Sequence, residues 1–344
     1  MKLGKKQLRI AFVGCVDEGR ECLREILDCG GNVTAIFTFT DEIAQKTSGA
    51  VSFEEISKRH NIPLHKVKST NTPEAIELFR ELNPDVIFVI GWTRLICKEV
   101  LEIPRLGCIG MHASLLPKYR GRAPVNWALI NGEQETGNSV MLLNEGVDTG
   151  KIVAQKAIKI TLADTCQTLY HKVAAAGRAM LREILPQLEK GYLPRIEQNE
   201  GEATVMPKRR PRDGIIDWQK NGMQLFNWVR ALTHPYPGAF TFLRGRKLFI
   251  WEARIAHYPR MGEHVGKWQH LSPGTVISID DGVAVLTGEN EILTLHRLQF
   301  EGEPETDWKT FTNQEQLLVG EVFQNVETKI NENLKTISPE SIND

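Results

Sequence analysis

The feature that most constrains this fold is the alternation of continuously apolar runs with amphipathic segments in the first half of the chain. The runs Leu-Arg-Ile-Ala-Phe-Val at 8–13 and Asp-Val-Ile-Phe-Val-Ile at 85–90 are typical of strands buried on both faces. Residues 32–38 read as a further strand, and apolar residues recur at helical spacing in 18–27, 53–60 and 72–82. This alternation predicts an α/β domain whose parallel sheet is covered by helices on both faces.

The rest of the chain predicts a second, smaller domain. Strand patterns at 138–143 and 151–160 precede a long amphipathic helix at 164–190, which we expect Asp164 or Thr165 to cap. After the basic run 208–212 and a helix at 222–232, short strands alternate with turn residues, at 240–243, 248–255, 274–279, 282–287 and 292–299. Such a pattern favours a small antiparallel barrel, and 344 residues are more than one hydrophobic core usually organises. We therefore predict domains at 1–205 and 206–323, followed by a polar tail at 324–344.

Composition excludes several classes of protein. The net charge of −1 gives no global field that would steer the chain to nucleic acid or an anionic membrane. No apolar run reaches 18 residues, and residues 1–6 lead into a strand pattern rather than a signal peptide, so we expect a cytoplasmic protein. The six cysteines form no Cys-x-x-Cys pair, which favours packed, reduced thiols over a metal site (Cys15, Cys22, Cys29, Cys97, Cys108, Cys166). The first three of them are spaced seven residues apart.

The most informative stretch is Met111-His-Ala-Ser-Leu-Leu-Pro-Lys-Tyr-Arg-Gly-Arg-Ala-Pro124, together with Asn144-Glu-Gly-Val-Asp-Thr-Gly150. A strand from Gly107 runs into His112, so the imidazole should lie at the carboxyl end of the sheet, where ligands bind in such folds. Asp148 precedes a turn between two strands, and a carboxylate within reach of an imidazole orients it and takes part in proton transfer. The spacing alone does not separate a catalytic pair from two structural residues. The turn 14–19 lacks both phosphate-loop signatures and is acidic.

These blocks resemble a known family. His112-x-Ser-Leu-Leu-Pro, Tyr119-Arg-Gly-Arg-Ala-Pro-Val-Asn-Trp127, Asn131-Gly-Glu and Gly146-Val-Asp-Thr-Gly150 look like the formyltransferases that use 10-formyltetrahydrofolate. The resemblance covers residues 8 to about 300 and implies a Rossmann-like catalytic domain followed by a barrel-like, OB-like C-terminal domain. The family includes methionyl-tRNA formyltransferase, glycinamide ribonucleotide formyltransferase and enzymes that formylate nucleotide-linked amino sugars.

The resemblance also implies a catalytic set, which this chain matches only in part. His112 and Asp148 stand where the family has its histidine and aspartate, whereas Gly110 stands where the family has an asparagine. During formyl transfer an amine attacks the formyl carbon, and the oxyanion that forms needs preorganised donors. Loss of one donor costs about 3 kcal/mol, or roughly a hundredfold in rate, so Gly110 predicts a slower or altered enzyme.

The resemblance assigns binding residues to two further groups. The folate donor is expected in an apolar slot formed by the segment after the 85–90 strand and by the Asp148 loop (Ile90, Gly91, Trp92, Leu95, Val147, Asp148). The acceptor is expected to contact the segment after His112, where arginines suit a diphosphate and an amide suits a sugar (Ser114, Tyr119, Arg120, Arg122, Asn126). For Arg122 a role in bracing the loop is an equal alternative. No metal is expected.

The acceptor is predicted to be a nucleotide-linked amino sugar, because 119–127, 209–213 and 236–240 are similar to the aminoarabinose-type enzymes. From Met206 onward 16 basic and 18 acidic residues give a net charge of −2, whereas a tRNA-binding domain should carry a basic face. Methionyl-tRNA formylation is the second hypothesis, and a folate- or nucleotide-binding relative without turnover is the third. No membrane partner is expected, and a homodimer is compatible with the sequence.

Overall fold

The computed structural model describes residues 7–255, 268 and 270–325. These residues form two compact units, the first comprising 7–210 with 234–236 and the second comprising 211–233 with 237–325. The domain bounds expected from the sequence, 1–205 and 206–323, stay predictions, and the expected polar tail lies outside the described residues from 326 on.

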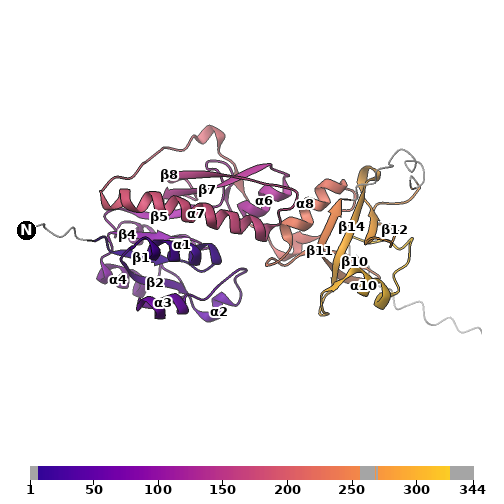
Figure 1. The fold of residues 1–344 in the computed structure, drawn as a ribbon, viewed down its shortest axis with the longest axis horizontal. Coiled ribbons are helices and arrows are strands. Elements are labelled where there is room, and N and C mark those ends of the chain that lie inside the picture. The colour runs from indigo at the N-terminus through magenta and orange to yellow at the C-terminus, as the bar shows by residue number, and fades with distance from the viewer. Residues whose placement is uncertain (1–6, 256–267, 269, 326–344) are drawn as a thin grey trace, which may run out of the picture. The chain divides into compact units, whose positions relative to one another are not determined.

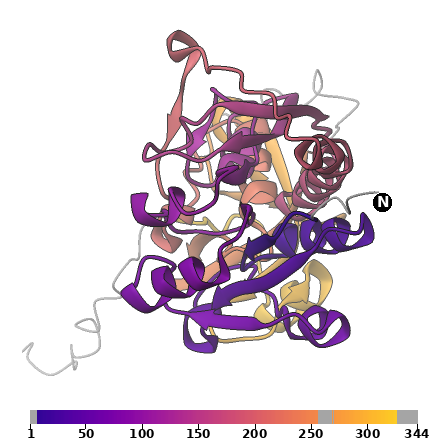
Figure 2. The ribbon, with the colours of Figure 1, turned by 90° about the vertical axis from the view of Figure 1, so that its left-hand side faces the viewer.

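The first unit is built on a seven-stranded sheet in the order β3-β2-β1-β4-β5-β7-β8 (Figures 1 and 2). The five strands from β3 to β5 are parallel, and β7 and β8 are antiparallel additions at one edge. The strands lie at β1 Ile10–Val13, β2 Val33–Phe39, β3 Leu64–Val67, β4 Val86–Val89, β5 Cys108–His112, β7 Glu135–Leu142 and β8 Ile152–Lys159. The predicted parallel α/β sheet is thus confirmed, with a mixed edge.

Helices cover both faces of this sheet because the central strands are apolar on both sides. The helices lie at α1 Asp17–Asp28, α2 Asp41–Ala44, α3 Glu54–His60, α4 Pro73–Leu82, α5 Lys98–Leu101, α6 Pro124–Ile130 and α7 Cys166–Glu189. On one face α1 and α7 pack against each other over Phe12, Phe88 and Ile109. On the other face α4 and α5 pack against residues such as Val13 and Val89.

Local signals explain where the long helix begins. The Thr165 side chain accepts the Thr168 N–H, and the Thr168 hydroxyl accepts the Thr165 N–H, which satisfies two amides of the first turn. Asp164 instead accepts from the amide of Thr161 and pairs with Lys172. Of the two expected capping residues, Thr165 is the one that caps the helix.

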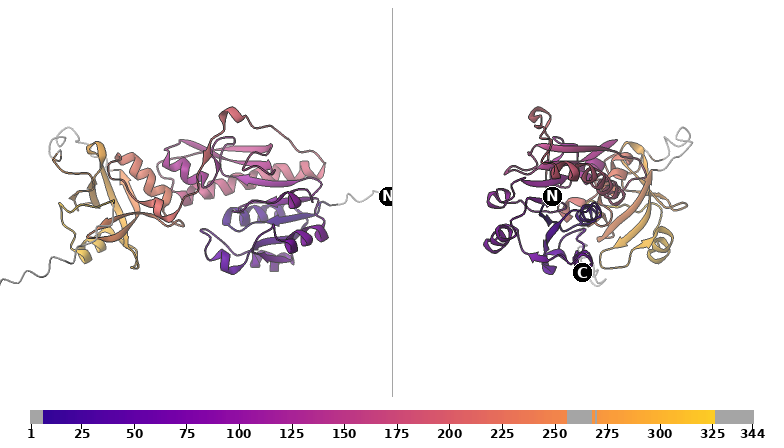
Figure 3. Two further views of the ribbon diagram at one scale, coloured as in Figure 1. Left: turned by 180° about the vertical axis from the view of Figure 1, so that it is seen from behind. Right: turned by 60° about the vertical axis from the view of Figure 1, so that its left-hand side comes forward.

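The second unit is an antiparallel sheet in the order β10-β11-β14-β13-β12, with β15 beside β14. Its elements are α8 Gly222–Leu232, β10 Ala239–Leu243, β11 Arg246–Ile255, β12 Val276–Ser278, β13 Val283–Leu286, β14 Ile292–Phe300, β15 Thr306–Asp307 and α10 Trp308–Glu315. Residues 322–324 form bridges to Phe242 and to Thr275, next to β12, so the sheet curls toward closure (Figure 3). The predicted antiparallel C-terminal domain is confirmed as a half-barrel.

Three further findings bear on the sequence analysis. None of the six cysteines forms a disulfide in the structure, and the described part of the chain holds no group of three potential metal ligands. Within the same residues no helix combines the length and the apolar character needed to cross a bilayer.

Candidate active site

His112 is the last residue of β5 and lies at the carboxyl end of the parallel strands. Its neighbour in β7 is Ser139, and only 8% of the side chain is exposed. The strand places His112 and Gly110 on the same face of the sheet, because side chains alternate along a strand. The apolar run Cys-Ile-Gly-Met thus carries one imidazole to the rim where ligands bind in this class of sheet.

The structure brings Asp148 to His112 although 35 residues separate them in the chain. Nδ1 of His112 lies 3.5 Å from Oδ2 of Asp148, and Nε2 lies 2.6 Å from the carbonyl oxygen of Tyr119. Asp148 Oδ2 also accepts the N–H of Gly121 at 2.8 Å. Both ring nitrogens therefore face oxygen acceptors, and the shorter of the two contacts is the one in which Nε2 would donate to the Tyr119 carbonyl.

The two residues that contact His112, Asp148 and Tyr119, lie on loops and have unusual backbone conformations. Asp148 and Tyr119 both have positive φ, 54° and 60°, which is costly for residues other than glycine. The phenol of Tyr119 donates to Glu133 and accepts from Asn131, and burial raises its pKa to about 12. Tyr119 is thus anchored at both its side chain and its backbone, so its carbonyl is a fixed partner for His112.

Gly110 contributes no side-chain donor next to His112. A Cβ built at this position would lie 2.6 Å from Cδ2 of Leu143, and its three nearest atoms all belong to the Leu143 side chain. An asparagine at 110 therefore fits only if the end of Leu143 rotates away. The leucine end is flexible, so the backbone itself does not exclude the amide.

The segment after β4 lies beside this rim. Gly91 has a φ of 64°, and a Cβ there would lie 2.7 Å from Val16 and 3.0 Å from the amide nitrogen of Gly19. The carbonyl of Gly91 accepts the amide of Cys15, so this segment and the acidic turn 14–19 close against each other. That contact uses the Cys15 amide of the turn within the protein.

The predicted donor-binding residues differ in exposure. Ile90 lies in the hydrophobic core, whereas Leu95 and Val147 leave 58% and 48% of their side chains exposed on the two loops. The ring centroids of Trp92 and Phe39 lie 4.0 Å apart with the rings tilted by 32°, and the indole N–H of Trp92 is buried without a hydrogen-bond partner among the described residues. The loops thus offer exposed apolar surface and one unused donor.

The predicted acceptor-binding residues are mostly engaged within the protein. Ser114 donates to the carbonyl of Lys118 and Asn126 is buried in α6, while Arg120 is buried and bonded to Gln198 and Glu200. Arg122 is exposed and donates to the carbonyl of Thr93, which ties its loop to the segment after β4. Arg122 is therefore the one of the two arginines with its charge at the surface.

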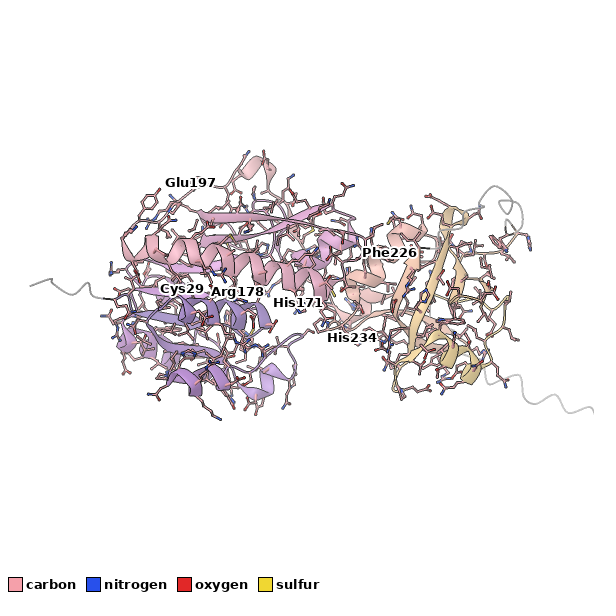
Figure 4. All side chains as sticks on the ribbon, in the orientation of Figure 1. Cys29, His171, Arg178, Glu197, Phe226 and His234 are labelled. Carbon is pink, nitrogen blue, oxygen red and sulfur yellow. The ribbon has the colours of Figure 1, made fainter. Side chains whose placement is uncertain are left out.

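Sequence reasoning did not single out the segment that holds these loops. Residues 196–206, hereafter the strap, follow α7 and run back along β8 toward the 119–122 loop (Figures 1 and 3). Glu197, labelled in Figure 4, marks its course at the edge of the unit. In the sequence the strap looks like an ordinary polar loop. No local pattern predicts its hydrogen bonds to Arg120 and Asp148, which lie about 50 to 80 positions away in the chain.

Comparisons with known proteins match both units. The profile of a family described as formyl transferase matches residues 8–185, and that of the formyl transferase C-terminal domain matches residues 208–316. A structure of HypX from Aquifex aeolicus in complex with tetrahydrofolic acid superimposes with a TM-score of 0.64 at 17% identity. That match covers 92% of this chain but 49% of HypX, so the chain spans about half the length of HypX.

Two sugar N-formyltransferases are similar over nearly their whole length. WlaRD, a sugar 3N-formyl transferase solved with dTDP and 5-N-formyl-THF, has a TM-score of 0.61 at 15% identity, covering 87% of this chain and 99% of that one. The N-formyltransferase from Helicobacter canadensis, solved with folinic acid and dTDP-3-aminofucose, has a TM-score of 0.62 at 15% identity, covering 84% and 99%. At these identities the likeness shows a shared fold.

Proposed function

The chain belongs to the formyl transferase family, and from that premise we propose that it moves a formyl group from 10-formyltetrahydrofolate to the primary amine of a nucleotide-linked amino sugar. The observation that carries the proposal is the contact between His112 and Asp148 at the carboxyl rim of the sheet. The proposal extends to the site residues expected from the sequence.

The donor would bind against the loops that follow β4 and β7. Leu95 and Val147 provide exposed apolar surface of the kind that a flat pterin ring covers. The indole N–H of Trp92 is a buried donor that has no partner among the described residues, and such a group gains free energy from an acceptor brought by a ligand. These features fit a folate. Ile90, which is buried in the core, would support the wall of the donor slot without touching solvent.

The reaction needs a donor for the oxyanion and a path for one proton. The acceptor amine adds to the formyl carbon and the bond from that carbon to N10 of the folate then breaks, while the proton lost by the amine is returned to N10. His112 would hold or move this proton, and Asp148 would orient the ring and stabilise its protonated form. Because Nε2 now faces the Tyr119 carbonyl, donation to a formyl oxygen requires His112 to exchange that partner.

Gly110 supports a slow enzyme within this scheme. The family asparagine would supply a second donor, and the glycine supplies none. The same residue supports the alternative of a relative that binds folate without turnover. Both alternatives keep the donor slot and differ in rate.

A nucleotide-linked sugar is supported by charge. Arg122 presents an exposed guanidinium on a loop tied to the segment after β4, and arginine suits diphosphate oxygens. The basic run 208–212 is short, and one member, Arg209, lies 5.0 Å over the ring of Trp127. WlaRD, a sugar 3N-formyl transferase, was solved with dTDP, and the N-formyltransferase from Helicobacter canadensis was solved with dTDP-3-aminofucose, which agrees with this assignment.

The test is the formation of tetrahydrofolate from 10-formyltetrahydrofolate with a panel of nucleotide-linked amino sugars, with charged initiator methionyl-tRNA, and with no acceptor. Stimulation by an amino sugar supports the proposal, whereas stimulation by tRNA alone replaces the acceptor. Folate binding without any turnover supports the relative that lacks catalysis. Asp148→Asn should greatly slow the stimulated rate while leaving it measurable, and Asp28→Asn, an exposed change at the end of α1, is the matched control.

A further inference from the structure

The strap ties together the two loops that carry the partners of His112. Its residues 205–206 pair with 120–121 as the short strands β9 (Val205–Met206) and β6 (Arg120–Gly121). Thr204 accepts the amide of Tyr119 through its hydroxyl and the amide of Arg120 through its carbonyl, both at 2.8 Å. The 119–121 loop is therefore fixed to the strap by its backbone.

Gln198 connects the strap to the Asp148 loop. Its Nε2 donates to the carbonyl of Asp148 at 2.8 Å and to the carbonyl of Gly150 at 2.7 Å. Its Oε1 accepts from Nε and Nη2 of Arg120 at 3.0 and 2.8 Å. One amide side chain thus uses both donor hydrogens and its acceptor to join two loops that flank the His112 contact.

Arg120 gives this connection a rigid end. Its guanidinium makes two bonds to the carboxylate of Glu200, at 2.6 and 2.8 Å, and its side chain is 5% exposed. Glu200 raises the pKa of Arg120, and Arg120 lowers the pKa of Glu200, so both groups stay charged. A forked pair of this kind holds the plane of the guanidinium and hence the direction of its bonds to Gln198.

The geometry bears on catalysis because of the backbone at Asp148. Its φ of 54° is held against an intrinsic cost, and the carbonyl of the same residue is the one that Gln198 binds. From this turn the carboxylate reaches both Gly121 and His112. A turn released from Gln198 can relax toward an ordinary conformation and take the carboxylate away from the imidazole.

We propose that Gln198, held by Arg120, is a positioning residue that keeps the carboxylate of Asp148 against His112. This inference rests on the proposed function, because it gives Asp148 its part in formyl transfer. Gln198 itself acts through the backbone of Asp148, and no contact with substrate is needed. The strap is accordingly part of the active site although it contributes no reacting group.

The test compares two variants with a matched control. Gln198→Ala removes all four bonds, and Gln198→Glu keeps an acceptor for Arg120 while setting a carboxylate oxygen against the carbonyls of Asp148 and Gly150. Both should lower kcat by about tenfold to a hundredfold, since small misplacements of a catalytic group have effects of this size, while KM for the folate changes little. Gln167→Ala, an exposed glutamine on α7, should leave both constants unchanged.

A double-mutant cycle separates positioning from mere support of the fold. In the Asp148→Asn background, Gln198→Ala should lower kcat no further, because its effect passes through Asp148. Equal losses in both backgrounds, or a KM effect alone, would overturn the inference while leaving the proposed function intact. A wild-type enzyme without formyl transfer would instead overturn the proposed function.

A spectroscopic measurement tests the inference even if the wild-type protein shows no formyl transfer. The ¹⁵N resonance of His112 Nδ1 reports its contact with the Asp148 carboxylate and needs no turnover. Gln198→Ala and Gln198→Glu should both shift this resonance in the direction that Asp148→Asn shifts it. If it stays at the wild-type position in folded Gln198 variants, Gln198 does not position Asp148.

Discussion

Replacing Glu18 with glutamine should stabilise the first unit, and the gain should grow with pH. Glu18 lies in the first turn of α1, where one of its carboxylate oxygens accepts the amide of Asn138 at 2.9 Å. Asn138 is fully buried in β7 and also donates to the carbonyl of Val173 in α7. Burial raises the pKa of Glu18 from 4.5 to about 7, and the Asn138 bond offsets only part of this shift.

The magnitude follows from this shift in pKa. A carboxyl group whose pKa is higher in the folded than in the unfolded state has no effect below its unfolded value, and it destabilises the fold increasingly as pH rises through the interval between the two. One pKa unit corresponds to about 1.4 kcal/mol, so the penalty is about 3 kcal/mol at about pH 8 and below about 1 kcal/mol at about pH 5. Glutamine can still accept the bond from Asn138 and carries no charge to desolvate.

The assay is the free energy of unfolding from denaturant titrations of wild type and Glu18→Gln near pH 5 and near pH 8. We expect a gain of about 2 to 3 kcal/mol at the higher pH and less than about 1 kcal/mol at the lower. Glu183→Gln, an exposed change on α7, is the control and should show no such trend. A gain for Glu18→Gln that is equal at both values would refute the assignment of a raised pKa, and a loss at the higher pH would show that the charge is stabilising.

Three further predictions concern the site. Gly110→Asn should raise kcat by roughly tenfold to a hundredfold if Leu143 rotates to admit the amide, and an unchanged kcat in steady-state assays would show that the position needs no donor. Leu95→Asp should weaken folate binding by about tenfold in titration calorimetry, since it places a charge on exposed apolar surface, and unchanged affinity would remove this loop from the donor slot. Arg122→Ala should raise KM for the nucleotide-linked sugar by about tenfold with little change for folate, while the exposed control Arg59→Ala changes neither; equal effects of Arg122→Ala on both substrates would make Arg122 a bracing residue.

Local pattern was sufficient for the framework of the first unit. The apolar runs that end at Val13 and Ile90 became β1 and β4, and the amphipathic stretch from Asp164 became α7 with bounds within two residues of those expected. These elements follow from the sequence because burial on both faces of a strand, or on one face of a helix, leaves a periodic record in the chain. The four-residue strand β3 was not assigned because so few residues leave little periodicity to detect, and the helix α6 was not assigned because the Pro- and Gly-containing stretch that leads into it reads as a loop.

The contacts within the candidate site could not be predicted from local pattern. The histidine and the aspartate stood out in the sequence by motif, yet their meeting depends on the pairing of β5 with β7, which brings residues 36 positions apart to one rim. Arg120 is buried against Glu200, a partner that the sequence did not indicate, while Gln198 carried no signal at all. Periodicity thus determined the layers and the strand directions in the parallel part, and the resemblance of the motifs to a family pointed to the residues at the rim. Only the tertiary structure decided which polar groups face one another there, because hydrogen bonds between distant segments depend on strand register and packing and not on local propensity.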